Sequence, residues 1–477
     1  MQAAFVNFGF LSALYLIVIV STMLVVLIEN KNPAKTAAWL LVLIFLPAIG
    51  LILYYIFGQN TRRKGQENPT GFEKFKEAMF GTTDLDSLFS SHQYRDKIPS
   101  KYASLVKLLE NSNDSWLLYG SDVEVITDGI RKFDALIEDL ENARHHIHME
   151  YFYFKRDETG RKIREILMRK AREGIKVRFL YENVANILVS PRFYSKMRET
   201  GVEVLPFSKR ALPWIRRQLN YRDHRKIVVV DGKIGYTGGM NIGNEYRKGW
   251  RDTHLRIQGA GVHGLQMNFL HVWYESGGGL VDDLTVYFPP AKIYSDDLMQ
   301  IVPEAPDSRW PYLLLATTEI VNIAQNYIYL QTPYYMPPEA LLQALQSAAL
   351  SGVDVRLMVS RKSDILFMDP ATQSFYEESL RAGIRIYELD EIFSHAKTLV
   401  IDDYVSVIGS ANLDFRSLEL SFELNAFMYD EKIAQENQAI FLNEMIDCRE
   451  VLLEDWLRRP WWRKFFESIM RLFSPLL

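Results

Sequence analysis

Two segments of this chain share one eight-residue pattern: His224–Asp231 reads HRKIVVVD and His395–Asp402 reads HAKTLVID. In each segment a lysine lies two positions after the histidine, and an aspartate follows after four more residues. Residues two apart on a β-strand share a face, so each histidine projects with its lysine, while the apolar run that follows is buried. The pattern predicts two strands that each present an imidazole and an ammonium group at their start.

The similarity between the two halves extends beyond these segments. Asn241 and Asn412 each lie 17 residues after their histidine, and Asp252 and Glu423 each lie 28 residues after it. Before each segment, helical patterns alternate with short apolar strands, which are predicted at 146–153, 175–180 and 201–204 and again at 327–334, 353–358 and 383–386. Strands that alternate with helices predict α/β domains with covered sheets. The recurrence predicts two such domains related by duplication.

The residues after each motif predict an anion site. A second strand ends in the loop 238–241 in the first copy and in the loop 409–412, which contains Ser410, in the second. Each loop returns an asparagine amide and backbone N–H groups to the end of the sheet that carries the histidine. If the two sites meet across a pseudo-two-fold axis, a phosphate can lie between two histidines, two lysines and two asparagines. One imidazole can then attack phosphorus while the other protonates the leaving oxygen.

Four carboxylates accompany these histidines. Asp252 and Glu423 are predicted to hold the imidazole rings in the required tautomer. Asp231 and Asp402 complete the two motifs and are candidate catalytic residues for that reason. They also lie at tight turns, where an aspartate bonds backbone N–H groups, and we expect this structural role to be the larger part of what they do.

The N-terminal region predicts a membrane anchor. No charged residue occurs in 1–28, and the apolar stretches of about 6–28 and 37–57 are each long enough to cross a hydrocarbon core. With no basic residue before the first stretch and no small-residue cleavage site after it, a secretory signal peptide is disfavoured. More basic residues follow the second stretch than lie between the two, which predicts that both ends of this two-helix hairpin are cytoplasmic. The polar residues 62–115 are predicted to be a tether.

Composition excludes several classes of protein. The chain has 477 residues and a net charge of -4, so it has no overall attraction for nucleic acids. Its single cysteine, Cys448, excludes an intramolecular disulfide and a cysteine-based zinc cluster. His146 and His148 share a strand face, but we expect them to be core residues rather than metal ligands. No metal and no cofactor is predicted.

Two further segments combine basic and aromatic residues. The first contains Lys209, Arg210, Trp214, Arg216, Arg217 and Arg222 and is predicted to attract anionic headgroups at the lip of the site. The second, residues 456–473, is an amphipathic segment that fits equally well a helix on the membrane surface and a helix docked on the catalytic domain.

The paired motif resembles that of the phospholipase D superfamily. The apolar hairpin, the segments Asn32–Lys35 and Leu46–Gly50, and the ending Arg471–Leu477 are similar to those of the bacterial cardiolipin synthases within it. The resemblance covers nearly the whole chain. One departure is His271 with Val272 before Trp273, where an acidic residue is expected.

The resemblance implies an enzyme of the bacterial inner membrane whose catalytic domains are cytoplasmic. It implies that one phosphatidylglycerol gives its phosphatidyl group to another, producing cardiolipin and glycerol through a phosphatidyl-histidine. By the usual order of the family, His224 is the nucleophile and His395 is the acid and base. The predicted partners are phosphatidylglycerol and cardiolipin in an anionic membrane, with no nucleic acid; the residues do not indicate an oligomeric state.

The predicted organisation is a hairpin in 1–61, a tether in 62–115, and domains in 116–285 and 286–477. Three alternatives fit the same residues. A membrane-bound phospholipase D hydrolase uses every one of the catalytic groups, with water as the acceptor. A tethered nuclease is disfavoured by the net charge, and an inactive lipid-binding scaffold by the presence of both histidines and both lysines.

Overall fold

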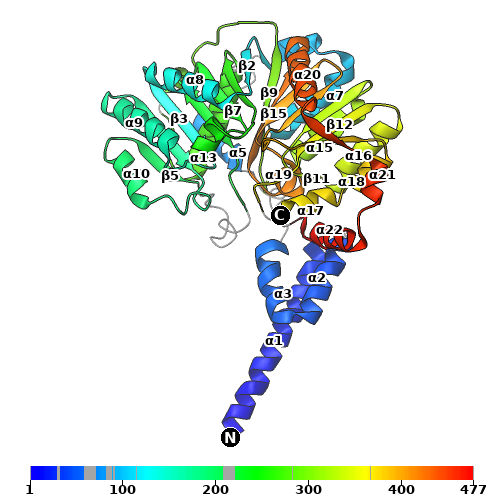
Figure 1. Cartoon of the computed structure of the whole chain (residues 1–477). Helices are drawn as coiled ribbons and strands as arrows, with labels where there is room; N and C mark the ends of the chain where they lie inside the picture. The colour runs from blue at the N-terminus through cyan, green and yellow to red at the C-terminus, as the bar shows by residue number, and fades with distance from the viewer. Residues whose placement is uncertain are drawn as a thin grey trace.

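The computed structural model describes residues 2–29, 33–58, 71–81, 89, 92–113, 115–207, 221–281, 283–365 and 367–475. Figure 1 shows two α/β lobes side by side, each with helices on the faces of a sheet, and N-terminal helices that extend from one end. The two mixed sheets confirm the predicted α/β class and the predicted duplication.

The two sheets repeat the same strand order. The first runs β2 (Asp122–Ile126), β8 (His254–Gln258), β7 (Ile234–Gly238), β6 (Lys226–Val230), β3 (His146–Tyr151), β4 (Lys176–Tyr181), β5 (Glu203–Pro206). The second runs β1 (Leu118–Tyr119), β9 (Leu298–Glu304), β17 (Glu423–Tyr429), β15 (Val405–Gly409), β14 (Thr398–Ile401), β10 (Tyr327–Gln331), β12 (Asp354–Ser360), β13 (Arg385–Leu389), β18 (Cys448–Val451). A small parallel pair, β11 (Tyr335–Met336) and β16 (Leu413–Asp414), lies apart. The motif strands β6 and β14 are therefore central and equivalent.

Helices connect the strands in the same places in both copies. In the first copy they are α8 (Gly129–Glu141), α9 (Glu158–Arg172), α10 (Pro191–Arg198), α12 (Asn244–Arg247), α13 (Gly261–Glu275) and α14 (Leu284–Tyr287). In the second they are α15 (Tyr312–Ile323), α16 (Glu339–Leu350), α17 (Met368–Gln373), α18 (Tyr376–Arg381), α19 (Phe415–Glu419), α20 (Glu431–Met445) and α21 (Leu453–Leu457). Several begin at an aspartate cap: Asp157 accepts a hydrogen bond from Gly160 N, and Asp430 accepts one from Ile433 N.

The two domains share one apolar core. Leu255 and Ile257 of β8 pack in the same buried cluster as Ile408 of β15 and Leu424 of β17. Burial of such side chains on both sides stabilises the interface as it stabilises a domain interior. The shared core fixes the two motif strands relative to each other.

Part of the predicted tether belongs to the second domain. Helix α7 (Ala103–Asn113) follows two short 3₁₀ turns, His92–Lys97 and Ser100–Tyr102, and buries Leu105 and Leu109 in that domain's core. Strand β1 then joins the second sheet by pairing with β9. The spacing of the apolar residues on α7 accounts for this docking, since they lie on one helical face.

Helix α5 (Gly71–Phe80) docks on α13 through aromatic residues. The rings of Phe72 and Phe75 lie 5.0 and 5.5 Å from the His271 ring, and Phe75 is fully buried. His271, the departure from the family pattern, is thus part of a packed aromatic cluster.

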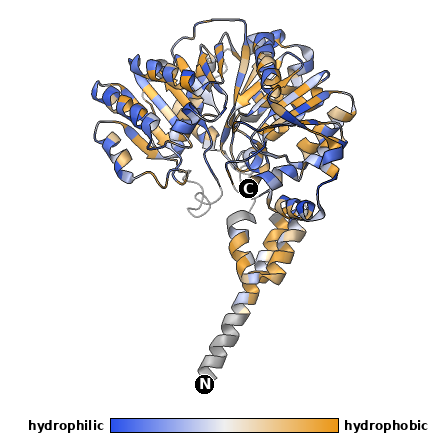
Figure 2. Cartoon of the chain, in the orientation of Figure 1, coloured by the Kyte–Doolittle hydropathy of each residue, from blue (hydrophilic) through white to orange (hydrophobic). Residues whose placement is uncertain are grey.

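The N-terminal helices are mostly hydrophobic where Figure 2 colours them. They are α1 (Gln2–Glu29), α2 (Pro33–Phe45), α3 (Pro47–Leu53) and a π-helical turn, Tyr54–Gly58. The sequence predicted two spans; within the described residues, no helix has both the length and the apolar character needed to cross a membrane.

The stretch predicted as the second span is not one continuous helix. Leu46 leaves the helical region at φ -132° and ψ 59°, and Pro47, which has no N–H to donate, begins α3. The ring centroids of Trp39 and Tyr54 lie 5.3 Å apart, which a straight helix does not allow for residues so distant in sequence. A Cβ on Gly50 would lie 2.9 Å from the carbonyl oxygen of Val42, so glycine is needed for this close approach. The chain reverses here, and α2 and α3 form a short helical hairpin.

Both ends of this short hairpin lie toward the catalytic domains, and α1 extends away from them (Figure 1). The Lys35 Nζ atom, near the start of α2, lies 4.3 Å from the ring centroid of Phe415 in α19.

The C-terminal helix α22 (Trp461–Phe473) lies on α17 and α18 at the same end of the molecule (Figure 1). Its buried Glu467 accepts hydrogen bonds from Arg459 and Arg463, and Arg471 pairs with Glu378. Its opposite face exposes large apolar side chains, namely Trp461, Trp462, Phe465, Phe466, Leu472 and Phe473. The helix is therefore both docked and amphipathic.

Candidate active site

Each motif histidine is held by the backbone of the other domain. His224 N donates to Phe422 O at 2.8 Å, and His395 N donates to Arg251 O at 2.7 Å. Both histidines lie just before their motif strands, so these bonds fix the two strand ends against each other. The predicted pseudo-two-fold arrangement is present in the backbone itself.

The carboxylates also cross the domain boundary. His224 Nδ1 lies 3.1 Å from Glu423 Oε1, and His395 Nδ1 lies 2.8 Å from Asp252 Oδ2. Both carboxylates are completely buried. A carboxylate at Nδ1 favours the tautomer that carries its proton there, which leaves Nε2 with a free lone pair. Asp252 and Glu423 thus lie where the ring-orienting role requires them, each beside the histidine of the other repeat.

The two carboxylates are supported differently. Ser410 Oγ donates to Glu423 Oε2 at 2.5 Å and accepts a hydrogen bond from Leu424 N at 2.9 Å. Its counterpart in the first copy is Gly239, where a Cβ would lie 2.1 Å from Asp252 Oδ1. Ser410 therefore supports the carboxylate and does not line the cavity, and Gly239 leaves room for Asp252.

The motif lysines are buried beside the histidines. Lys226 Nζ donates to His224 O, and Lys397 Nζ donates to His395 O at 2.5 Å. Lys397 Nζ also lies 3.0 Å from His395 Nδ1. Burial lowers the pKa of Lys226, and it lowers the pKa of Lys397 to about 8, although nearby carboxylates oppose the change.

Burial keeps the imidazoles neutral near neutral pH. It lowers the pKa of His224, an effect that Glu423 opposes. Burial and then the charge of Lys397 lower the pKa of His395 to about 4, and Asp252 opposes them. Neutral imidazoles with a free Nε2 lone pair are suited to nucleophilic attack and proton abstraction.

One cavity of about 760 Å³ contains both histidines and both lysines. Asn241 and Asn412 also line it. Asn241 is fixed at both ends of its amide, because Oδ1 accepts from Tyr153 N and Nδ2 donates to Tyr246 Oη. The cavity thus brings together three of the predicted residue types, one of each from either repeat.

Aromatic residues that sequence reasoning missed complete the cavity wall. The Phe152 ring lies 4.1 Å from the His224 ring, and the rings of Tyr246 and Trp250 each lie 5.7 Å from that of His395. Tyr153 and Tyr334 line the cavity at equivalent places after β3 and β10. Their common place in the repeat was a signal that was available in the sequence.

Asp231 and Asp402 lie outside the cavity. The Asp231 carboxylate accepts hydrogen bonds from the backbone N–H groups of Arg144, His145 and His146. Asp402 does the same for residues 325, 326 and 327 and also binds Lys101 Nζ. Both occupy the left-handed region, with φ of 54° and 49°. Their contacts are those of the expected turn role.

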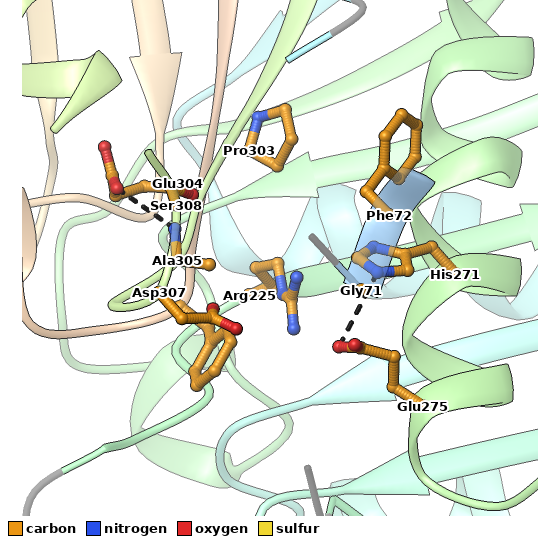
Figure 3. A pocket seen from close by; sticks show the side chains of 11 residues that line it. Gly71, Phe72, Arg225, His271, Glu275, Pro303, Glu304, Ala305, Asp307 and Ser308 are labelled. Carbon is orange, nitrogen blue, oxygen red and sulfur yellow. Dashed lines mark hydrogen bonds and ion pairs between the residues drawn. The ribbon is translucent and has the colours of Figure 1, made fainter. Parts of the chain in front are cut away.

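Arg225 points away from the cavity, into a buried charged cluster. Its Nε lies 2.9 Å from Asp223 Oδ1 and 3.0 Å from Glu150 Oε1. Burial, followed by the charge of Asp223, raises the pKa of Glu150 well above its usual range. Figure 3 shows the guanidinium directed into a hollow between Glu275 of α13 and the segment 303–308. This hollow, about 40 Å³, contains neither motif histidine.

Two other sequence predictions concern residues near the site. His146 and His148 are buried and each bonds Gln266, as expected for core histidines. In the basic segment predicted at the lip of the site, residues 209–217 lie outside the described residues. Arg222 is described, and its Nη1 atom lies 3.7 Å from Glu182 Oε1.

Comparison with known proteins first defines a class. The family model described as "Cardiolipin synthase, PLD-like domain" matches residues 136–273 and 318–445, and "Phospholipase_D-nuclease N-terminal" matches residues 13–59. The crystal structure of phosphatidylserine synthase from Haemophilus influenzae Rd KW20 shares the fold, with a TM-score of 0.59 over 78% of this chain and 99% of that chain at 15% identity. The chain is a two-domain protein of the phospholipase D superfamily.

Closer relatives specify the family. The major cardiolipin synthase ClsA of Bacillus subtilis (strain 168) is 37% identical over 98% of each chain. The cardiolipin synthase of Listeria monocytogenes serotype 4a (strain HCC23) is 38% identical over 95% of each chain. This chain belongs to the cardiolipin synthase family, and it is a phosphatidyltransferase associated with membranes.

Proposed function

We propose that the chain transfers a phosphatidyl group from one phosphatidylglycerol to a hydroxyl of a second, releasing glycerol and forming cardiolipin, with His224 as the nucleophile. The observation that carries this proposal is the pair of imidazoles in one cavity, each backed by a buried carboxylate of the opposite domain. Such a pair supplies both a nucleophile and a proton carrier for double displacement at phosphorus.

In the first step, His224 Nε2 attacks the phosphorus of the donor. The bond from phosphorus to the glycerol oxygen breaks, and that oxygen takes a proton from His395. The product is a phosphatidyl group on His224, whose ring then carries positive charge beside Glu423. The low pKa of His395 makes its protonated form a strong acid, and the anionic phosphodiester favours protonation as it binds.

In the second step, the acceptor's primary hydroxyl gives its proton to His395 and its oxygen attacks the same phosphorus. The phosphorus–nitrogen bond breaks, and His224 returns to the neutral form. In this step Lys226 and Lys397 exchange their bonds to the histidine carbonyls for bonds to the non-bridging phosphate oxygens. Water at the acceptor position would give phosphatidic acid instead.

Product analysis tests the proposal. Purified protein in phosphatidylglycerol micelles should form cardiolipin and glycerol in equal amounts, resolved by mass spectrometry. Phosphatidic acid as the main product would instead support the hydrolase, and the absence of turnover of any phospholipid would remove the proposal.

We also propose a membrane arrangement in which α1 crosses the inner membrane once and the α2–α3 hairpin enters from the cytoplasmic side and returns to it. The support comes from the sequence, because residues 1–28 carry no charged side chain and 28 residues at 1.5 Å per residue reach about 42 Å, more than the thickness of the hydrocarbon core. All five basic residues near these helices, Lys31, Lys35, Arg62, Arg63 and Lys64, then lie on the catalytic side, as the positive-inside rule favours. In this arrangement the exposed aromatic face of α22 contacts the cytoplasmic surface of the same membrane.

This arrangement differs from the hairpin predicted from sequence, in which both ends are cytoplasmic. Reporter fusions distinguish the two membrane arrangements. A reporter before Met1 should be active only as a periplasmic enzyme, and a reporter after Thr61 only as a cytoplasmic one. A cytoplasmic N-terminus would restore the two-span hairpin.

A further inference from the structure

Two short loops at the rim of the active-site cavity expose apolar side chains to solvent. In the first domain, Ile187 and Leu188 are 75% and 96% exposed; in the second, Ile365 and Phe367 are 46% and 49% exposed. Ile187, Leu188 and Ile365 line the cavity that contains His224 and His395. Exposed apolar groups of this size are unfavourable in water and indicate a contact with something apolar.

The two loops are equivalent in the repeat. Asn186-Ile187-Leu188 begins 10 residues after the start of β4, and Asp364-Ile365-Leu366 begins 10 residues after the start of β12; Leu366 itself is outside the described residues. Because the domains are related by a pseudo-two-fold axis, one loop comes from each half of the catalytic unit. The apolar pair is therefore a feature of both halves of the site.

Polar contacts at the base hold each loop in place. Asn186 Nδ2 donates to the carbonyl oxygens of Phe152 and Glu182, and its Oδ1 accepts from Phe154 N. In the second loop, Asp364 accepts a hydrogen bond from Tyr334 Oη, and Ser363 N donates to Asp369 Oδ1 at 2.7 Å. Phe367 is held at φ 73°, a conformation that a bulky residue rarely adopts. Hydrogen bonds therefore fix the base of each loop, while its apolar side chains stay exposed to solvent.

Both loops lie toward the membrane anchor. They lead directly into α10 and α17, which Figure 1 places in the half of the body from which α1–α3 extend. Helix α17 in turn supports α22, since Arg463 donates to Gln373 Oε1 at 2.9 Å. The second-domain loop is thus connected through α17 to the helix that carries the exposed aromatic face.

We propose that these two loops bind the acyl chains of bilayer phospholipids, one loop for the donor and one for the acceptor. A phosphatidylglycerol presents a phosphate to the two histidines and two fatty chains beside it, and the matched apolar loops beside a cavity for phosphate transfer fit that chemistry. This inference rests on the proposed function. It places the acyl chains at the rim of the cavity while the phosphate reaches the histidines inside it.

Paired loop variants test the inference in the full-length enzyme. Ile187→Ser with Leu188→Ser, and separately Ile365→Ser with Phe367→Ser, remove the apolar groups. Ile446→Ser is the matched control, because Ile446 is 77% exposed at the end of α20 and does not line the cavity. Cardiolipin formation is measured with long-chain phosphatidylglycerol in vesicles and with monomeric dibutanoyl phosphatidylglycerol.

The loop variants should raise KM for the vesicle substrate by about tenfold or more, because burial of one large aliphatic side chain changes a partition constant by roughly ten- to a hundredfold. Their kcat/KM for the dibutanoyl substrate, whose chains are short, should fall by a much smaller factor than their kcat/KM for the vesicle substrate. A vesicle KM equal to that of Ile446→Ser overturns the inference, as does a parallel loss with both substrates. If wild type itself forms no cardiolipin, the proposed function fails instead.

A direct measurement guards against an effect on folding. Leu188→Cys in a Cys448→Ser background gives one cysteine for a fluorescent label. Lipids brominated along the acyl chain should quench that label, whereas a label at Ile446→Cys should be unaffected. Equal quenching at the two positions, or none at Leu188→Cys, contradicts acyl-chain contact.

Discussion

Replacing Asp252 with asparagine should slow transfer by about 10²- to 10⁴-fold while leaving the fold intact. The Asp252 carboxylate is completely buried and lies 2.8 Å from His395 Nδ1. The asparagine amide has the same shape as the carboxylate but lacks its negative charge, so it accepts a weaker hydrogen bond from His395 Nδ1–H. Its own N–H group can instead donate to Nδ1, which favours the tautomer of His395 that carries the proton on Nε2. A hydrogen bond to a charged group contributes about 1.5–3 kcal/mol, and a histidine left in the wrong tautomer has cost about 10⁴ in kcat in a serine protease. At about 1.4 kcal/mol per tenfold, the range corresponds to roughly 3–6 kcal/mol of transition-state stabilisation.

The assay can also show which histidine Asp252 serves. A phosphatidyl donor with p-nitrophenol as leaving group needs no acid, so the first step should lose less than about tenfold in Asp252→Asn. Glu423→Gln, which affects the ring of His224, should remain slow with this donor. Asp430→Asn, at the cap of α20, is the control for loss of a partly buried carboxylate that accepts a backbone N–H bond.

Two results would refute this reasoning. One is an Asp252→Asn enzyme within about threefold of wild type with phosphatidylglycerol. The other is an equal loss in Asp252→Asn and Glu423→Gln with the p-nitrophenyl donor, because the cross-domain pairing assigns the two carboxylates to different steps.

His224→Ala and His395→Ala should each reduce transfer by at least about 10⁴-fold with unchanged thermal unfolding, and appreciable cardiolipin synthesis by either would remove the two-histidine mechanism. Folding stability should fall as pH drops from about 6.5 to 4, because burial lowers the pKa values of His146, His263 and His395 to about 4, so the unfolded chain binds more protons in this window. Each of the three contributes up to about 3 kcal/mol; a Tm independent of pH in this range would contradict their burial as neutral groups. Asp231→Ala should lower Tm by several degrees but leave kcat within about tenfold below the transition, since its carboxylate bonds three backbone N–H groups outside the cavity; a stable but inactive variant would show a catalytic role.

The chemistry of the site could be predicted because it depends on local patterns that the duplication repeats. His224 and Lys226 share a strand face by the period of a strand, and the matched offsets of Asn241 and Asn412 place both amides at the same end of their sheets. The sequence could not show that each carboxylate serves the histidine of the other domain. That pairing depends on how two sheets pack over a shared core, which is not a periodic property of either half.

Longer-range features also escaped prediction. The reversal at Leu46 and Pro47 depends on close packing of α3 against α2, and a hydropathy pattern alone does not distinguish it from a kinked span. The polar surroundings of α7 favour a tether, yet Leu105 and Leu109 enter the core of the second domain. Such docking is decided by partners distant in sequence.

The central claim is that His224 carries the phosphatidyl group between two lipids. The most direct test is to mix the enzyme with phosphatidylglycerol, quench at alkaline pH where a phosphorus–nitrogen bond on histidine survives, and map the peptides by mass spectrometry. Transfer through His224 predicts a phosphatidyl adduct on that residue, formed and lost at the rate of turnover and absent from His224→Ala. An adduct on His395 instead, or cardiolipin synthesis with no adduct on either histidine, would contradict it.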